Sequence, residues 1–366
     1  TQATPGDNSS KNFFPWFFNA FRNILENYHG IWSSEAAARA PFMPSGQVSE
    51  RPWRHVAYSG TVIDKDGTIW TKKSGLTVTG SLASLSPSGK ESRVRSFASY
   101  ASDLAYDENG GRIWWSETLP DIRWTLGGSS RIRFADLSNP SKIHDLTKKG
   151  RYFNPAPSKD GKRVAAVEYP PMGGSRAVVL NVPEGSVERI VEAPDSLQFT
   201  ELTWIGDTLF AAGLSDHGIG IYEVASGRVV LEPQRVELSH LKAFRSSLTF
   251  VCDRTGVNEM YLLDVSTGNL RQVTSTRYGI SAPAFNPAAD TLFYSSLAPS
   301  DDPGAYRQGR MIYSTPVNDL PMTPVSFRDI HKYPVAEALS SQEKALAGEA
   351  WESIQEYSET SFSAPR

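Results

Sequence analysis

Short hydrophobic runs, each preceded by a tight turn, recur along most of this chain. For example, Asp66-Gly67 leads into Thr68–Lys72, and Asp160-Gly161 leads into Arg163–Glu168. Six such runs begin at residues 68, 112, 163, 209, 248 and 292. Asp-Gly pairs tolerate positive φ and are typical of tight β-hairpins. The pattern therefore predicts a series of hairpins, each leading into a buried strand.

A second set of segments alternates with the first. Each is a strand that ends in a small polar turn, such as Leu263-Asp-Val265-Ser-Thr-Gly268. The third residues of the six copies stand at 85, 137, 182, 224, 265 and 315, which gives steps of 52, 45, 42, 41 and 50 residues. Steps of roughly 40–50 residues are typical of four-stranded propeller blades. Twelve matches in strict alternation favour an array of repeats over a large β-sandwich, which is the competing interpretation.

The expected fold is an all-β, six-bladed β-propeller of four-stranded antiparallel blades, with short helical extensions at both termini. The blades are expected near residues 53–100, 101–152, 153–199, 200–241, 242–281 and 282–328. All six copies are in phase, so we expect no strand from one terminus to complete the blade of the other. The domains would be 1–50, a flexible start and helical extension; 51–330, the propeller; and 331–366, a helical extension and tail.

The regions outside the expected ring carry weaker signals. Apolar residues at helical spacing, among them Phe14, Phe17 and Phe21, predict a helix with one apolar face near the N-terminus. This face would pack against the propeller or contact another domain. Asn8-Ser9-Ser10 is a glycosylation sequon, a pattern that is common by chance.

Composition narrows the functional classes. The net charge is -3, with acidic and basic residues mixed, so the chain has no basic stripe suited to nucleic acid. No apolar run approaches the roughly 20 residues that span a membrane. The single cysteine, Cys252, lies in an apolar run and is expected to be a buried structural thiol.

The sequence contains no familiar catalytic or metal-binding motif. No two of the six histidines have the His-Glu-x-x-His spacing of a zinc peptidase, and no Gly-x-Ser-x-Gly elbow is present. Asp64-Lys-Asp66-Gly superficially resembles a calcium loop, but a hairpin turn explains it, because Gly75 stands where an EF-hand needs glutamate. We expect no catalytic residue, no metal and no cofactor.

Candidate binding residues lie in the long loops between the second and third strands of blades. Asp121, Arg123 and Trp124 fall in this loop of blade 2, and Tyr306 falls in the matching loop of blade 6. An acid, a base and an aromatic together can bind a peptide or a sugar, and Trp, Tyr and Arg are enriched at binding hot spots. The alternative is structural: Arg123 would pair with Asp121 while Trp124 packs over its own blade.

The order of elements around blade 2 resembles a known family. Trp115-Ser-Glu-Thr-Leu-Pro-Asp-Ile-Arg-Trp124, followed by Arg151-Tyr-Phe153 and Ser158-Lys-Asp-Gly-Lys162, is similar to the TolB-like, WD40-like propeller segment of large Bacteroidetes cell-envelope proteins. In that family the propeller tends to follow a gluzincin-like peptidase region, which is absent here. The resemblance covers roughly residues 50–345. It implies an envelope location (periplasm or outer-membrane associated) and a supporting role beside another domain.

The sequence therefore favours a non-catalytic propeller that binds a protein partner or docks a neighbouring domain. Two alternatives stay open. The propeller could gate substrate for a catalytic region outside this chain, or it could bind peptide or glycan through exposed aromatic side chains.

Overall fold

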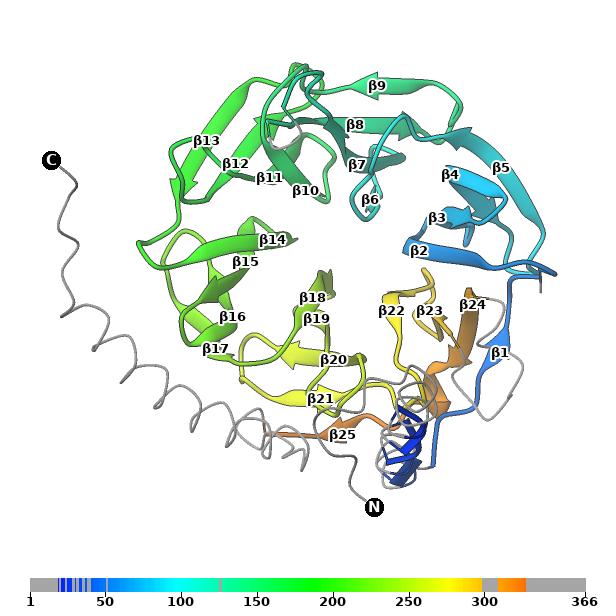
Figure 1. Cartoon of the computed structure of the whole chain (residues 1–366). Coiled ribbons are helices and arrows are strands. Elements are labelled where there is room, and N and C mark those ends of the chain that lie inside the picture. The colour runs from blue at the N-terminus through cyan, green and yellow to red at the C-terminus, as the bar shows by residue number, and fades with distance from the viewer. Residues whose placement is uncertain are drawn as a thin grey trace, which may run out of the picture.

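The computed structural model describes residues 41–50, 52–124, 127–297 and 309–326, together with 19, 21–23, 25–27, 30, 33, 34 and 37. Its main body is a ring of antiparallel β-sheets around a central axis (Figure 1). The prediction of an all-β propeller built from four-stranded antiparallel sheets is confirmed.

Three sheets are separate four-stranded units in which each strand pairs with the next along the chain. The first contains β6 Ala105–Asp107, β7 Arg112–Leu119, β8 Ser129–Asp136 and β9 Ile143–Asp145. The second contains β10 Tyr152–Pro157, β11 Arg163–Glu168, β12 Arg176–Asn181 and β13 Val187–Glu192. The third contains β14 Gln198–Ile205, β15 Thr208–Ser215, β16 Gly218–Glu223 and β17 Val229–Gln234.

A fourth sheet has five strands. Its members are β18 Leu238–Phe244, β19 Ser247–Cys252, β20 Glu259–Asp264, β21 Leu270–Gln272 and β25 Thr323–Pro324. The short 3-10 helix η2, Val317–Asp319, precedes β25 in the chain. Because β25 pairs with β21, it covers what would otherwise be the open edge of this sheet.

The remaining eight strands form one continuous sheet. They are β22 Ser281–Phe285, β23 Thr291–Ser296, β24 Gly309–Pro316, β2 Val56–Ile63, β3 Ile69–Gly75, β4 Val78–Leu85, β5 Glu91–Ser96 and β1 Gly46–Gln47. Two antiparallel units meet in it through a short parallel pair, Val56 with Gly309 and Ala57 with Arg310. The described residues thus form five hydrogen-bonded sheets instead of the six that the repeats suggested.

Ring closure differs from the sequence-based expectation that no strand crosses between the ends of the chain. That expectation is wrong, because β1 pairs antiparallel with β24, with Gly46 opposite Ser314 and Gln47 opposite Tyr313. The N-terminal segment thus supplies the outer strand beside β24. A strand of two residues leaves too little hydrophobic pattern to reveal this exchange in the sequence.

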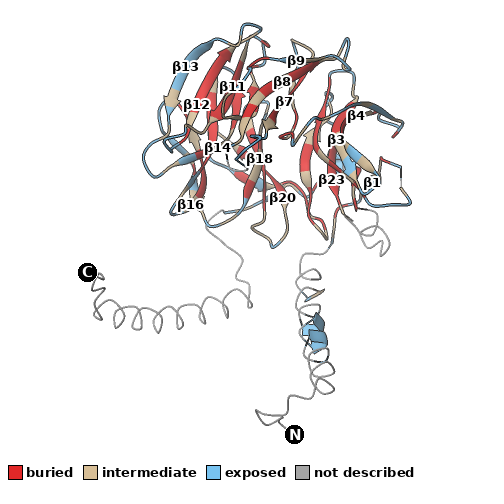
Figure 2. Cartoon of the chain, turned by 45° about the horizontal axis from the view of Figure 1, so that its top comes forward, coloured by how far each residue is buried: buried red, intermediate tan, exposed pale blue. Residues whose placement is uncertain are grey.

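The hydrophobic core fills the spaces between neighbouring sheets. Adjacent residues of β7 point to opposite faces, as the period of a strand requires. Trp115 packs in a cluster with Trp70 and Leu82, whereas Trp114 packs in a cluster with Val178 on the other side. The second strand of each antiparallel unit is covered on both faces. Its residues are therefore apolar in an unbroken run, which is the pattern seen in the sequence. Figure 2 shows the buried strands inside the ring and the exposed outer strand β13.

The six inner strands β2, β6, β10, β14, β18 and β22 contact one another in sequence around the axis, and β22 returns to β2. The chain direction alternates in each antiparallel unit. The loops between second and third strands therefore lie at the same end of the ring as the links that lead into the next inner strand. This end is called the loop face below.

Helical structure in the described residues is minimal. Before residue 41, the described positions are helical, such as Phe21 and Leu25. The helix expected within residues 331–366 lies outside the described residues. Among the helices in the described part of the chain, none is long and apolar enough to cross a membrane.

Candidate functional site

The structure brings three of the four candidate residues together in one turn of the β7–β8 loop. The Asp121 carboxylate accepts hydrogen bonds from the backbone N–H groups of Arg123, at 2.8 Å, and Trp124, at 2.9 Å. These two bonds hold the pKa of Asp121 below its usual value. Tyr306 lies outside the described residues.

The side chains of this turn are displayed to solvent. Trp124 is 69% exposed, so it does not pack over its own sheet. The Asp121 carboxylate caps the backbone of the turn, and in the described part of the chain it forms no ion pair with Arg123. The geometry therefore does not match the structural alternative, in which Trp124 packs over its own blade and Arg123 pairs with Asp121. A role of these residues in binding stays a proposal.

Trp124 belongs to a larger group of exposed apolar side chains on the loop face. Each member is between 69% and 103% exposed. We call this group the apolar arc, and its members are Trp53, Leu76, Tyr100, Ile122, Trp124 and Met172. Exposed apolar patches of this kind mark interaction sites more often than singly scattered residues do.

Hydrogen bonds join several of the loops that carry these residues. The N–H of Leu76 bonds the carbonyl of His55, two residues from Trp53, at 3.3 Å. The N–H of Thr118 bonds the carbonyl of Tyr100 at 3.0 Å, which places Tyr100 at the base of the β7–β8 loop. Further along, residues 130 and 150 pair with each other, as do 151 and 169, which connects this loop to the one that carries Met172. The arc therefore follows the loop face across three neighbouring groups of strands.

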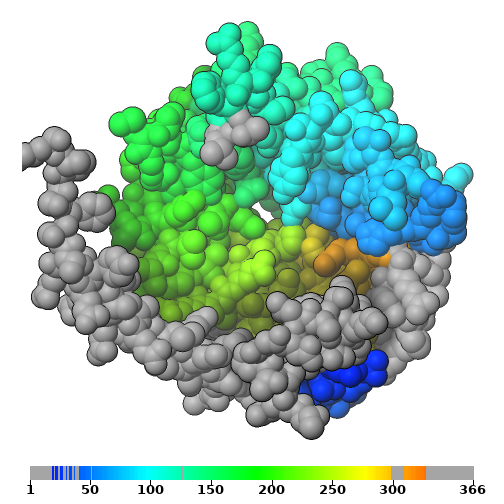
Figure 3. Space-filling view, in the orientation of Figure 1, coloured from blue at the N-terminus to red at the C-terminus, as the bar shows by residue number. Residues whose placement is uncertain are grey.

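A second candidate site lies in the central channel, whose opening is visible in Figure 3. Four inner-strand residues, together with Lys72 of β3 and Asp103 of the link before β6, contribute polar and charged side chains there. We call this group the channel cluster: Lys72, Asp103, Glu201, His240, Lys242 and Ser281. Nothing in the repeat pattern pointed to it.

The central contact of the channel cluster spans the ring. Asp103 Oδ2 lies 2.8 Å from His240 Nδ1, and Asp103 Oδ1 lies 2.9 Å from Lys72 Nζ. Asp103 lies two residues before β6, while His240 lies in β18, and two inner strands separate β6 from β18 in either direction around the ring. The pair therefore joins opposite sides of the channel.

Charge and burial act in opposite directions on these groups. Burial alone would raise the pKa of Asp103, but the hydrogen bond and charge of His240, together with Lys72, lower it well below its usual value. Burial raises the pKa of Glu201 against the opposing influence of His240. Burial also lowers the pKa of Lys242, while Asp103 and Glu201 oppose that shift.

Every charged group of the cluster already has partners within the ring. Glu201 accepts the backbone N–H groups of His240 and Leu241 at 3.1 and 2.6 Å. Lys242 Nζ donates to the carbonyl oxygen of Thr61 at 3.0 Å. Buried charges that are paired in this way more often have a structural role than a ligand-binding role.

Backbone bulges bring these side chains into the channel. The inner strands shift register between Phe199 and Glu201 in β14, and between Ser239 and Lys242 in β18. His240 has φ of 55°, a conformation that is unfavourable for most non-glycine residues. The sequence signal that was available is the presence of polar residues within otherwise apolar inner strands, as in Leu238–Phe244.

The order of groups at His240 matches that of a serine hydrolase, since its Nε2 lies 3.1 Å from Ser281 Oγ and its Nδ1 faces Asp103. We nevertheless expect no nucleophilic activity, because Lys72 shares the Asp103 carboxylate and the cluster satisfies its own charges. A fluorophosphonate probe should leave Ser281 unlabelled in intact protein, as judged by peptide mass spectrometry. Labelling that disappears in a His240→Asn variant would show that the serine is activated.

The other chemical candidates have structural roles. Asp64 accepts the N–H groups of Asp66 and Thr68, and the indole N–H of Trp70 at 2.8 Å, so the calcium-like segment is a capped hairpin turn. Cys252 is buried, and burial raises the pKa of its thiol to about 12. Among the residues described, no group of three or more His, Cys, Asp or Glu side chains is placed to hold a metal ion.

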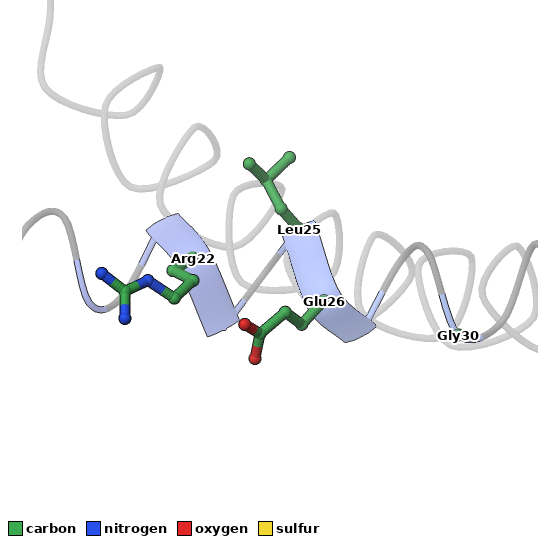
Figure 4. A pocket seen from close by; sticks show the side chains of 4 residues that line it. All are labelled: Arg22, Leu25, Glu26 and Gly30. Carbon is green, nitrogen blue, oxygen red and sulfur yellow. The ribbon is translucent and has the colours of Figure 1, made fainter. Parts of the chain in front are cut away.

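A pocket on the N-terminal segment is lined by Arg22, Leu25, Glu26 and Gly30 (Figure 4). In this view Leu25 points to the opposite side of the ribbon from Glu26. The lining comes from one short stretch of chain, so no convergent set of polar groups is formed there.

No family model matches the sequence. No curated protein matches it either. Solved structures with a similar fold include the β-propeller domain of the Trilobed protease from Pyrococcus furiosus, with 9% identity, a TM-score of 0.48, and coverage of 77% of this chain and 98% of that one. TolB from Acinetobacter baumannii shows 14% identity and a TM-score of 0.45, covering 75% of this chain and 65% of TolB. A chain of a nidogen/laminin complex shows 15% identity and a TM-score of 0.48, with 61% and 84% coverage.

Proposed function

We propose that this chain is a non-catalytic, six-bladed β-propeller that binds a protein partner, or docks a neighbouring domain, on its loop face. The count of six treats the eight-stranded sheet as two antiparallel blades that meet at the short β2–β24 pair. The observation that carries the functional proposal is the apolar arc, a set of exposed apolar side chains on neighbouring loops at one end of the ring.

The contact residues proposed from the sequence fit this surface. Arg123 and Trp124 stand at the centre of the arc, on a turn that Asp121 holds in shape. Tyr306 lies outside the described residues and is kept as a proposed contact on the sequence argument alone. We also retain as proposals an envelope location, a Bacteroidetes-type multidomain parent, and the domain boundaries at 1–50, 51–330 and 331–366. The pairing of β1 extends the ring itself back to Gly46.

Two features make the alternative functions less suitable. Aliphatic side chains such as Leu76 and Met172 offer no flat face for a sugar ring, so the arc is better matched to protein than to glycan. The contact between Asp103 and His240 spans the channel, which disfavours passage of a substrate through the ring.

Substitution of the arc tests the proposal. Changing Trp53, Leu76, Ile122 and Trp124 together to serine should abolish capture of partners by cross-linking from the source cells. Hot-spot residues contribute about 2 kcal/mol or more each, so loss of even one should weaken binding by roughly 30-fold. A smaller variant, Arg123→Ala with Trp124→Ala, should weaken binding while leaving the melting temperature unchanged.

The matched control uses exposed apolar residues outside the arc. Val187 and Ile190 of β13 and Val229 of β17 are exposed on outer strands. Their triple change to serine should leave capture intact. The proposal fails if the arc variant retains the same proteins as the wild-type chain.

A further inference from the structure

Four of the inner strands have the same irregularity. In β2, β10, β18 and β22 the register advances by three residues on the inner strand and by two on its neighbour, so each of these strands has a two-residue bulge. The first residue of each bulge has a φ between 48° and 59°, and these residues are Gly60, Asn154, His240 and Ala282. A bulge leaves residues out of the hydrogen-bonded ladder of its own sheet. The backbone groups of these bulges are therefore available for contacts across the channel.

One ammonium group contacts two of these bulges. Lys242 Nζ donates to the carbonyl oxygen of Thr61, in the bulge of β2, at 3.0 Å, and more distantly to that of Pro283, in the bulge of β22, at 3.4 Å. Lys242 itself directly follows the bulge of β18. The inner strands β18, β22 and β2 are consecutive around the ring (Figure 1), so a single side chain joins three neighbouring blades.

The groups around Lys242 compensate for the burial of its charge. Burial lowers the pKa of Lys242, and the negative charges of Asp103 and Glu201 oppose that shift. Buried charges are tolerated where hydrogen bonds and opposite charges replace water. The arrangement is that of a cation held by carbonyl oxygens, with two carboxylates nearby.

We propose that the carbonyl oxygens of Thr61 and Pro283 form a site for an ammonium-type cation in the channel, and that Lys242 Nζ fills this site as a tethered cation. A primary ammonium ion suits the site better than a metal ion. Two carbonyl oxygens can accept its hydrogen bonds, whereas Ca²⁺ takes six to eight oxygen ligands. In the described part of the chain, no group of three or more His, Cys, Asp or Glu side chains is placed to hold a metal ion. This role goes beyond the proposed function, because it does not depend on what binds the loop face.

Chemical rescue tests the site. Lys242→Ala removes the side-chain atoms beyond Cβ, which correspond to one propylammonium ion. The variant should melt several degrees below the wild-type chain, because two carbonyl oxygens lose their donor. Propylammonium chloride should recover part of this loss, since a ligand that binds only the folded state stabilises it. Tetramethylammonium chloride at the same concentration should not, because that ion donates no hydrogen bond. Thermal unfolding followed by circular dichroism gives all of these melting temperatures.

Two further variants separate the charge from its aliphatic stem. Lys242→Met keeps a long side chain without the ammonium group, so it should be destabilised and should not respond to propylammonium, because its side chain fills the space. Lys162→Ala, in an exposed turn, should melt like the wild-type chain in both salts. If Lys242→Ala does not fold without the amine, its refolding yield in the two salts replaces the melting temperature as the measurement. A Lys242→Met protein as stable as the wild-type chain, or a Lys242→Ala protein that responds equally to both salts, would overturn the proposal.

Discussion

Replacing Glu117 with alanine should lower the free energy of unfolding by about 3–5 kcal/mol, because a buried charge network would lose its central acceptor. Glu117 is 1% exposed. One of its carboxylate oxygens accepts the N–H groups of Ala98 and Ser99 at 2.8 and 3.1 Å, and the other lies 2.6 Å from Arg133 Nη1. The loss can be measured by denaturant unfolding followed by fluorescence.

The same carboxylate supports the apolar arc. Ala98 and Ser99 lead directly into Tyr100, and Glu117 itself lies in β7, which leads into the loop of Trp124. Without Glu117 this link loses two of its anchoring bonds. We therefore expect Glu117→Ala to weaken partner binding as well as stability.

Two comparisons test the explanation. Glu108→Ala removes an exposed pair with Lys159, at 3.8 Å, and should cost less than about 0.5 kcal/mol. Replacing Glu117 and Arg133 together by leucine should cost less than Glu117→Ala alone, because no unpaired charge stays buried. If Glu117→Ala were as mild as the Glu108 variant, the buried network would not be important for stability.

The parts of the fold that the sequence revealed are those with a repeated local pattern. The Asp66-Gly67 turn and the apolar run that follows it form a hairpin into β3, as expected, and Gly67 has φ of 80°. Turns of this kind depend on a few neighbouring residues, so they can be read locally. The adjacent tryptophans Trp114 and Trp115 likewise predicted a strand, and the structure shows it buried on both faces.

Features that depend on distant residues could not be read in this way. The pairing of β1 with β24 joins Gly46 to Ser314 across most of the chain, and neither residue has a distinctive pattern. The contact between Asp103 and His240 depends on the bulge in β18 and on the number of strands between the two residues. Of the candidate site, the loop of Arg123 and Trp124 was found because its residue types are typical of hot spots, whereas Leu76 and Met172 gave no such signal.

The channel cluster can explain how the loop face keeps its shape. The loop face needs exposed loops held in a fixed relative position, whereas loops are the more mobile parts of most folds. The contact between Asp103 and His240 answers this need, since it ties a link on the loop face to the opposite inner strand. A ring braced across its channel keeps the arc preorganised, which reduces the entropy lost when a partner binds.

The brace can be tested by removing its charge. Asp103→Asn should lower the free energy of unfolding by about 2 kcal/mol at neutral pH, less than for a fully buried pair because the Asp103 side chain is 41% exposed. His240→Asn is the matching change on the other side, since asparagine tolerates positive φ. The double variant should lose less than the sum of the two single losses, because the two residues form one interaction. Additive losses would mean that the pair is not energetically coupled.

The pH dependence of the Asp103→Asn effect gives the more specific result. The folded-state pKa of Asp103 lies below its usual value, so its contribution to stability is fully present above the unfolded-state pKa and is lost as pH falls through the folded-state pKa. The difference in unfolding free energy between wild type and Asp103→Asn should therefore be largest at about pH 5–6, above the ordinary pKa of an aspartate and below that of a histidine. It should shrink below about pH 4, where the carboxyl of the unfolded chain takes up a proton. Denaturant unfolding of both proteins across this range measures the difference directly, and Asp66→Asn, at an exposed turn, should show no comparable change. A difference that stays constant down to pH 3, or grows there, would show that Asp103 does not act through its charge and that the channel is braced by packing alone.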